Sequence, residues 1–465
     1  MGEPTGDGEG SAAMRRAVRY GWMPLVALGA TVALENGERQ SLAQAADGIQ
    51  ARFGVSDAVI GWLPFAMIVV GVVGAFPIGI LADRARRTWL LAVAVVVWTV
   101  CMGLTGLAGT YFLLFLARLG VGAVEATGPA AVSLIADYYP VKSRARMMSL
   151  YQSGALLGSV MGLVLGGVVV DLWGWEWAFW MWVPLGLLVT VFIARQPEPA
   201  RGDHDAEFEA DLALTMPGGT EVGDLANITG LLPEPTRIGT LDYRTATHRE
   251  VGRELLRIPS MWFGVLALTV SQLLLNGLQF WGVLYFKRVH GLDAAAAGAV
   301  MGLIGAGSVI GILGGGFLSD RYLRRGFLNA RVYVVAFGSI AATIVLMPAF
   351  ASTNLVASVP LLFLGGICLT LPIAPAEALV SDVVVAELRG RAATVRSVVR
   401  ALSAAGIPII GGLSALTDLR VALVVFAPVY AIGGVIMLAA TRTYPSDVAF
   451  AVAETRRLRT PEDAP

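Results

Sequence analysis

Three charged side chains stand at the end of the first apolar stretch of the sequence, where they could exchange protons or bind an anion. The apolar residues 21–34 lead into Glu35, Glu38 and Arg39, whose spacing lets all three face one side of a helix. A carboxylate in an apolar cavity has its pKa raised by desolvation and lowered by a nearby arginine, so a change in exposure makes it load or release a proton. The pattern indicates proton exchange; the alternative is that the three residues cap a solvated helix end.

A second charged pair lies in the apolar run 111–137. Arg118 and Glu125 are seven residues apart, which places them on the same face of a helix, and glycine, alanine and valine flank Glu125. Charges at bilayer depth are costly and mark ion or substrate pathways. We therefore predict that Glu38 and Glu125 carry protons. Arg118 would be a partner on the same helix as Glu125, and Arg39 a counter-ion or a ligand for an anionic headgroup.

Amide side chains mark a third candidate region, in the run 260–286. Gln272, Asn276 and Gln279 follow one another at i, i+4 and i+7, so they share a helix face. Intramembrane amides line a cavity or hydrogen-bond a neighbouring helix, and the sequence leaves both open. Trp281 could add an aromatic wall, although core packing is the more common role. The predicted substrate-contacting residues are Glu35, Arg39, Arg118, Gln272, Asn276, Gln279 and Trp281.

The composition shows what kind of element must position these residues. Hydrophobic residues make up 56% of the chain and charged residues 15%, whereas soluble domains carry about 25% charge. Apolar runs of about 20 residues, enough to span a bilayer as a helix, recur along the chain. The twelve runs are 18–42, 57–82, 88–107, 111–137, 146–171, 176–194, 260–286, 294–319, 328–349, 355–381, 392–416 and 419–441. The sequence predicts an all-α membrane protein with twelve transmembrane helices.

The apolar pattern is interrupted by one long polar segment, which separates six predicted helices from six. The predicted parts are a cytoplasmic N-terminal tail (1–17), a six-helix bundle (18–194), a cytoplasmic linker with a short helix near 244–257 (195–257), a second six-helix bundle (258–441) and a cytoplasmic C-terminal tail (442–465).

Two sequence echoes relate the halves to each other. GILADRARR at 79–87 matches GFLSDRYLRR at 316–325, and LIADYYPVKSRAR at 134–146 matches LVSDVVVAELRGR at 379–391. Both echoes fall at corresponding places in the two halves, so they indicate an internal repeat with pseudo-symmetric halves.

Glycine recurs at every fourth position in two of the apolar runs. Such ridges permit close approach of helix backbones, and we expect them to pack across the two halves, where sliding is needed. The ridge residues are Gly154, Gly158, Gly162 and Gly166 in one run and Gly307, Gly311 and Gly315 in the other.

Arginine-rich loops predict the orientation of the chain in the membrane. They occur at the N-terminus and in alternate loops, for example ADRARR and VKSRAR, while the intervening loops contain almost no arginine or lysine. By the positive-inside rule, both termini face the cytoplasm. Only two lysines occur in a chain rich in alanine, glycine and valine, which suggests a GC-rich bacterial genome. We expect an uncleaved first helix and a monomer in the bacterial cytoplasmic membrane.

The repeated G-x-L-x-D-R loop resembles the signature loop of the major facilitator superfamily. Within that superfamily the chain looks most like the Spinster-type lipid transporters. The narrower resemblance rests on ENGERQSLAQAADGIQARFGVSD, RLGVGAVEATGPAAVSLIADYY and SDVVVAELRGRA. The resemblance implies two six-helix halves, an acid–arginine pair in the first helix, and a lysophospholipid or sphingoid phosphate as substrate.

The same resemblance implies an inner gate. In such a gate the loop aspartate contacts the N-terminal end of a helix in the opposite half, where the helix dipole favours an anion. The predicted gating residues are Asp83, Arg84, Arg87, Asp137, Arg144, Asp320 and Arg321.

These observations together favour a proton-coupled secondary transporter that moves a lipid-like substrate by alternating access. A multidrug–proton antiporter is the alternative within the same fold, although the fifth helix lacks the Gly-Pro pair usual in drug exporters. A receptor that does not transport is a further alternative, which the charges at 38, 39 and 125 disfavour. Zero net charge argues against nucleic-acid partners. No metal cluster, nucleophile motif or P-loop appears in the sequence, so we expect neither an enzyme nor a cofactor.

Overall fold

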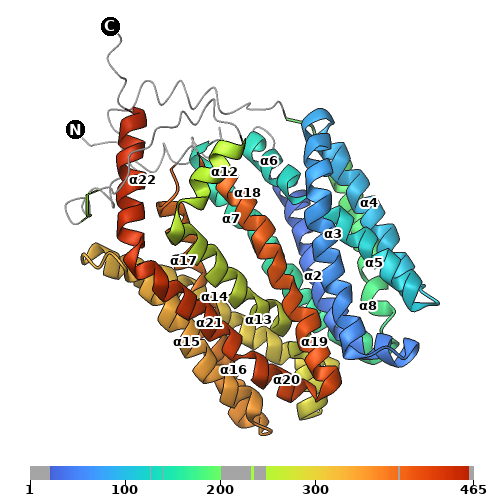
Figure 1. Cartoon of the computed structure of the whole chain (residues 1–465). Helices are drawn as coiled ribbons and strands as arrows, with labels where there is room; N and C mark the ends of the chain where they lie inside the picture. The colour runs from blue at the N-terminus through green and yellow to red at the C-terminus, as the bar shows by residue number, and fades with distance from the viewer. Residues whose placement is uncertain are drawn as a thin grey trace, which may run out of the picture. The chain divides into compact units, whose positions relative to one another are not determined.

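The chain folds into two compact units, shown in the computed structural model of Figure 1. The structure describes residues 21–125, 127–139, 141–199, 232–234, 248–385 and 388–459, and every regular element within these ranges is a helix. Unit 1 is drawn from Met1–Val55, Leu63–Gly218 and Leu292–Ala299, and unit 2 from Ser56–Trp62, Gly219–Gly291 and Val300–Pro465.

The first part of the chain supplies eight helices to the described structure. They are α2 (Met23–Phe53), α3 (Asp57–Arg84), α4 (Arg87–Gly106), α5 (Tyr111–Glu125), α6 (Gly128–Tyr138), α7 (Val141–Trp173), α8 (Trp177–Trp180) and α9 (Trp182–Ala194).

The second part begins with α12 (His248–Leu256), which lies where the sequence predicts a short helix in the linker. The helices that follow are α13 (Pro259–His290), α14 (Ala294–Arg324), α15 (Ala330–Ala351), α16 (Leu355–Thr370), α17 (Ile373–Asp382), α18 (Arg389–Ala401), η3 (Leu402–Ala405), α19 (Gly406–Leu416), α20 (Leu419–Phe426), α21 (Pro428–Ala439), η4 (Ala440–Arg442) and α22 (Tyr444–Arg459).

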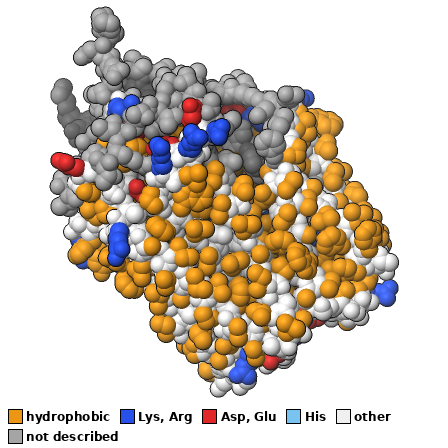
Figure 2. Space-filling view, in the orientation of Figure 1, with side chains coloured by type: hydrophobic (Ala, Val, Ile, Leu, Met, Phe, Trp, Pro, Cys, Tyr) orange, Lys and Arg blue, Asp and Glu red, His pale blue; other side chains and the backbone are white. Residues whose placement is uncertain are grey.

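Most of these helices have the length and apolarity of membrane spans. Within the described ranges ten helical stretches are long and apolar enough to cross a membrane, and Tyr111–Ala123 is a shorter apolar helix. Residues 23–42 of the remaining predicted span lie in α2 (Met23–Phe53). Large apolar side chains such as Phe112, Val356 and Leu416 are exposed, and Figure 2 shows hydrophobic groups over the visible faces of the helices. This surface suits lipid, and the prediction of an all-α, multi-pass membrane protein is confirmed.

Local sequence explains where the long helices α2 and α13 begin and end. Each has a proline in its first turn, where the missing N–H costs nothing. Each stops at a glycine in the left-handed region, Gly54 at φ 65° and Gly291 at φ 66°, which a residue with a side chain rarely adopts. The two helices, 31 and 32 residues long, therefore share the same start and stop signals.

The glycine ridges pack within each unit, so the expectation that they pack across the two halves is wrong. In unit 1 a Cβ added to Gly158 or Gly162 of α7 would collide with backbone oxygens of Ala33 and Gly37 on α2. In unit 2 a Cβ on Gly315 of α14 would collide in the same way with the Leu371 carbonyl at the end of α16. The ridges let two helices of one unit touch backbone to backbone, which favours rigid packing over sliding.

Candidate functional site: charged groups inside the helical units

The most buried charges of unit 1 form an ion pair between α2 and α5. Arg118 Nη2 donates a hydrogen bond to Glu38 Oε1, and the two side chains are 1% and 0% exposed. The sequence predicted a partner role for Arg118 and a buried environment for Glu38, but it did not say that they meet. Because desolvating two charges costs several kcal/mol per ion, the pair points to a function beyond packing.

Apolar and polarizable groups enclose the guanidinium of Arg118. The sulfur atoms of Met102 and Met67 lie 3.6 and 3.2 Å from its terminal nitrogens, and its Cζ lies 5.4 Å from the ring centroid of Phe179. Within the described part of the chain, Arg118 Nε has no hydrogen-bond acceptor. Neutralising Glu38 would therefore leave a cation that cannot lose its proton in an apolar shell.

The neighbouring charges of α2 lie in different surroundings. Glu35 is half-buried and Arg39 is exposed, whereas Glu38 is fully buried. Helix α2 continues to Phe53, so the prediction that these residues cap a helix end is wrong. The side chain of Glu125, at the end of α5, lies outside the described residues, and its proposed titration stays a prediction.

A second network of unit 1 surrounds Arg87, at the start of α4. Its guanidinium donates to Ser133 Oγ at 2.8 Å, to Glu198 Oε1 at 3.0 Å and to Asp137. The Glu198 carboxylate also accepts the backbone N–H groups of Arg87 and Thr88 at 3.2 and 2.9 Å. It therefore caps the positive end of α4.

The protonation of Glu198 reflects these contacts. Burial raises the pKa of this carboxyl group, but the hydrogen bonds from Thr88 and Arg87 outweigh burial and hold the pKa below its ordinary value. The sequence placed Arg87 and Asp137 among the gating residues, and the structure brings these two together. The sequence analysis did not single out Glu198. Its only sequence signal is that it is an acidic residue in the PEP segment after the sixth predicted span.

Unit 2 holds the counterpart of this network around Arg331, at the start of α15. Arg331 pairs with Asp382, and its Nη2 lies 3.5 Å from Asp320 Oδ1. Tyr444 Oη, from α22, donates to Asp382 Oδ2 at 2.6 Å. Asp382 occupies the same position of the sequence echo as Asp137, so the repeat could have predicted its role.

The structure describes the side chains of only some of the remaining predicted gating residues. The side chain of Asp320 is 54% exposed and pairs with Arg331 of its own unit, and Arg321 is exposed. The side chains of Asp83, Arg84 and Arg144 lie outside the described residues. The gating role of all these residues stays a prediction.

A polar cluster joins α17 to α18 in unit 2. Glu377 accepts hydrogen bonds from Arg396 at 2.5 Å and from Arg400 at 2.6 Å, and the three side chains are 22–35% exposed. Near it, Asn276 Nδ2 donates to Ser403 Oγ at 2.9 Å, so this amide bonds a neighbouring helix. Arg396 gave a sequence signal as the last residue of the arginine-rich segment ELRGRAATVR, whereas Arg400 lies four residues beyond that segment.

The other residues of the amide stripe differ in burial. Gln272 is half-buried and Gln279 is exposed on α13. Trp281 is completely buried, and its Nε1 donates to the Ile407 carbonyl at 2.8 Å. The geometry of Trp281 is that of core packing, the more common of the two roles that the sequence allowed.

Apolar helices that enclose charged pairs define the class of this molecule as a multi-pass membrane protein with polar groups inside its helical units. The model of the Major Facilitator Superfamily matches residues 27–405, so the chain belongs to that family. It is therefore a membrane transporter and not an enzyme, as the sequence predicted.

Individual relatives agree with the narrower resemblance. The chain is 25% identical over 317 residues to the uncharacterized transporter YybO of Bacillus subtilis, covering 67% of this chain and 68% of that protein. It is 27% identical over 403 residues to the protein spinster homolog 1 of Xenopus tropicalis, covering 81% of this chain and 69% of that protein. The predicted resemblance to Spinster proteins is confirmed.

Solved structures share the fold. A bacterial homolog of the human lysosomal transporter Spinster, in an inward-facing and occupied conformation, superposes with a TM-score of 0.74 at 21% identity, covering 92% of this chain and 98% of that one. A D-xylose–proton symporter gives a TM-score of 0.66 at 14% identity, covering 92% and 99%. At these identities the likeness establishes the major facilitator fold and nothing about substrate.

Proposed function

We propose that the chain is a proton-coupled transporter of an amphipathic, lysophospholipid-type substrate. It would act as a monomer in the bacterial cytoplasmic membrane, with both termini in the cytoplasm. The buried pair of Glu38 and Arg118 is the observation that carries the proton coupling. A transporter needs a site whose protonation changes the energy of one conformation, and an ion pair shielded from water meets that need.

Protonation acts on this pair through the charge of Arg118. When Glu38 takes up a proton, its attraction for the guanidinium is lost while Arg118 keeps its charge in a shell of Met67, Met102 and Phe179. Such an uncompensated charge favours any conformation that offers it water or another carboxylate. Glu125 lies seven residues after Arg118 on α5. It would be that other carboxylate and the second proton carrier.

The lipid-like substrate is supported by the resemblance to Spinster proteins and by the exposed guanidinium of Arg39 one residue from Glu38. Arginine can give paired hydrogen bonds to phosphate oxygens in a way that lysine cannot. A 29% identity over 154 residues to the multidrug resistance protein 3 of Bacillus subtilis supports the alternative, a drug–proton antiporter.

Uptake into proteoliposomes tests the proton coupling. Glu38→Gln keeps an oxygen that can accept from Arg118 but cannot carry a proton. We expect it to abolish uptake of a lysophospholipid driven by a pH gradient while gradient-free exchange continues. Glu176→Gln, which removes a carboxylate far along the chain from the pair, is the control and should transport normally. Full gradient-driven uptake by Glu38→Gln would overturn the assignment.

Binding of matched ligands tests the substrate class. Wild type and Arg39→Lys are titrated with lysophospholipids and with monoacylglycerols of equal chain length. Affinity should rise with chain length, by about 0.8 kcal/mol per buried methylene, and Arg39→Lys should weaken the phosphate-bearing series more. Equal losses in both series would remove Arg39 from the headgroup site, and preference for aromatic cations would favour the drug antiporter.

A further inference from the structure

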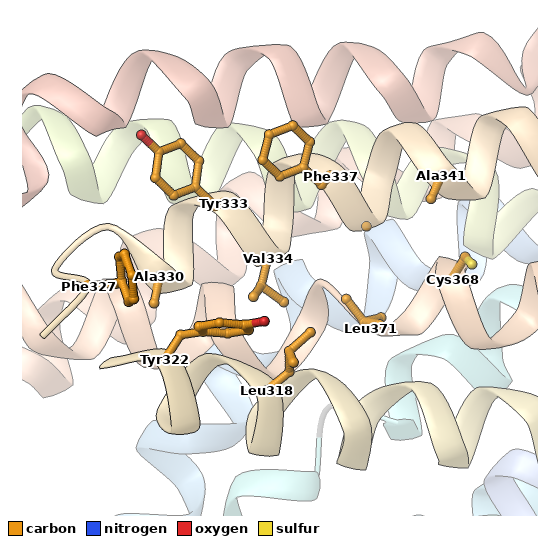
Figure 3. Close-up of a pocket in the computed structure, with 11 residues that line it drawn as sticks. Leu318, Tyr322, Phe327, Ala330, Tyr333, Val334, Phe337, Ala341, Cys368 and Leu371 are labelled. Carbon is orange, nitrogen blue, oxygen red and sulfur yellow. The ribbon is translucent and has the colours of Figure 1, made fainter. Parts of the chain in front are cut away.

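An apolar groove lies on unit 2, next in the chain to the paired residues Arg331 and Asp320. Its volume is about 600 Å³, within the range of small-molecule sites. It is formed by α14, α15 and the end of α16, and Figure 3 shows its side chains. Tyr322, Tyr333 and Phe337 stand around the groove, while the small residues Ala330 and Ala341 leave room between them.

The groove has one polar end and one apolar end. Tyr322 and Phe327 lie near the loop between α14 and α15, whereas Cys368 and Ala341 lie deeper along the helices (Figure 3). The loop end carries the motif arginines Arg321, Arg324 and Arg325, all exposed. An elongated apolar groove with arginines at one end is complementary to a molecule that has a hydrocarbon chain and an anionic headgroup.

Direct contacts tie these arginines to the groove. Arg325 Cζ lies 5.8 Å from the ring centroid of Tyr322, and the same ring packs edge-on against Phe327 at 6.1 Å. Asp320, the acidic residue of the same loop motif, is paired with Arg331. Tyr322 thus holds a guanidinium at the mouth of a groove that it also lines, a geometry suited to a phosphate.

We propose that this groove binds an anionic diacyl phospholipid of the surrounding bilayer, with one acyl chain along α15 and the phosphate at Arg325. Tyr333 and Phe337 are 43% and 60% exposed on α15, which is long and apolar enough to span a membrane, so bilayer phospholipids would reach the groove. Selection by headgroup charge distinguishes such a site from ordinary contact with lipid tails. The proposal goes beyond transport and does not depend on Glu38, Arg39 or the nature of the substrate.

Native mass spectrometry of the full-length protein tests this site. Purified protein is incubated with equal amounts of phosphatidylglycerol and phosphatidylethanolamine, and the bound lipids are counted. We expect at least a threefold preference for phosphatidylglycerol in the wild type. Arg325→Gln should abolish the preference, while Arg195→Gln, an exposed arginine at the end of α9, should keep it.

A second pair of variants tests the acyl-chain part of the groove. Ala341→Phe fills the deep end and should reduce bound phosphatidylglycerol severalfold. Ile344→Phe adds a ring on the same helix at a position that is 67% exposed and not part of the groove, and it should leave binding unchanged. Equal retention of the two lipids by the wild type would overturn the proposal, as would binding unaffected by both Arg325→Gln and Ala341→Phe. Loss of binding in Ile344→Phe as well would also overturn the groove as the site.

Discussion

The two units hold their intramembrane charges in opposite ways. In unit 1, Glu38 pairs with Arg118, and the two side chains are 0% and 1% exposed. In unit 2, Glu377 is shared by two arginines, and the three side chains are 22–35% exposed. Water can screen and rearrange around the unit 2 cluster, but it cannot reach the unit 1 pair.

The difference in exposure predicts different responses of the two clusters to the loss of a charge. A pair shielded from water responds sharply to the loss of one charge, because the remaining charge loses its partner at a position that water does not reach. A half-exposed cluster with one positive charge in excess responds weakly to mutation and can attract an anion from solution. We therefore propose that the buried pair of unit 1 responds to protonation and that the more exposed cluster of unit 2 attracts anions.

The largest effect should come from breaking the sealed pair. Glu38→Leu leaves the Arg118 cation unpaired in an apolar shell, so it should destabilise the protein by about 3–5 kcal/mol. Adding Arg118→Met removes the orphan charge and should restore most of the loss. Thermal unfolding of the three proteins in one detergent measures this, and a double variant as unstable as Glu38→Leu would contradict the sealed-pair interpretation.

A much smaller effect is expected at the corresponding carboxylate of unit 2. Glu377→Leu leaves Arg396 and Arg400 partly in contact with solvent, so the loss should be about 1 kcal/mol or less. The same unfolding assay compares it directly with Glu38→Leu. Losses of similar size in the two variants would show that exposure does not distinguish the clusters.

The smallest effect concerns pH, through the two arginine networks at the starts of α4 and α15. The pKa of Glu198 is lowered in the folded protein, so its contribution is present above its unfolded pKa of about 4.3 and is lost as the pH falls through the lowered value. Wild type should therefore lose stability on acidification below about pH 4 more steeply than Glu198→Gln. The measurement is the unfolding free energy of both proteins as a function of pH. An equal loss of stability in the two proteins on acidification would contradict this role of Glu198.

The unit 2 network should add a dependence at alkaline pH. One of its members is a phenol, and burial raises the pKa of Tyr444 to about 12. The contribution of Tyr444 is fully present below its unfolded pKa of about 10 and is lost as the pH rises toward the folded value. Tyr444→Phe should accordingly change the alkaline limb of the stability profile and leave the acid limb as in wild type.

Much of the architecture could be predicted because its signals are local in sequence. Apolar runs of membrane length, proline and glycine at the ends of α2 and α13, and the echo of Asp137 by Asp382 are all readable without contacts. The length of an apolar run and the backbone conformation at its ends depend on residues that are adjacent in sequence. These local features were therefore enough to predict a helical membrane protein.

Contacts between distant helices were decided only by the tertiary structure. Periodicity puts Arg118 on a face of α5, but it does not say that this face meets Glu38, 80 residues earlier in the chain. Likewise it shows a glycine ridge on α7 without naming α2 as its partner. The sequence by itself determined which segments are helical and membrane-spanning, because those properties are local. Only the packing decided which charges are sealed from water, because burial depends on what the other helices place around them.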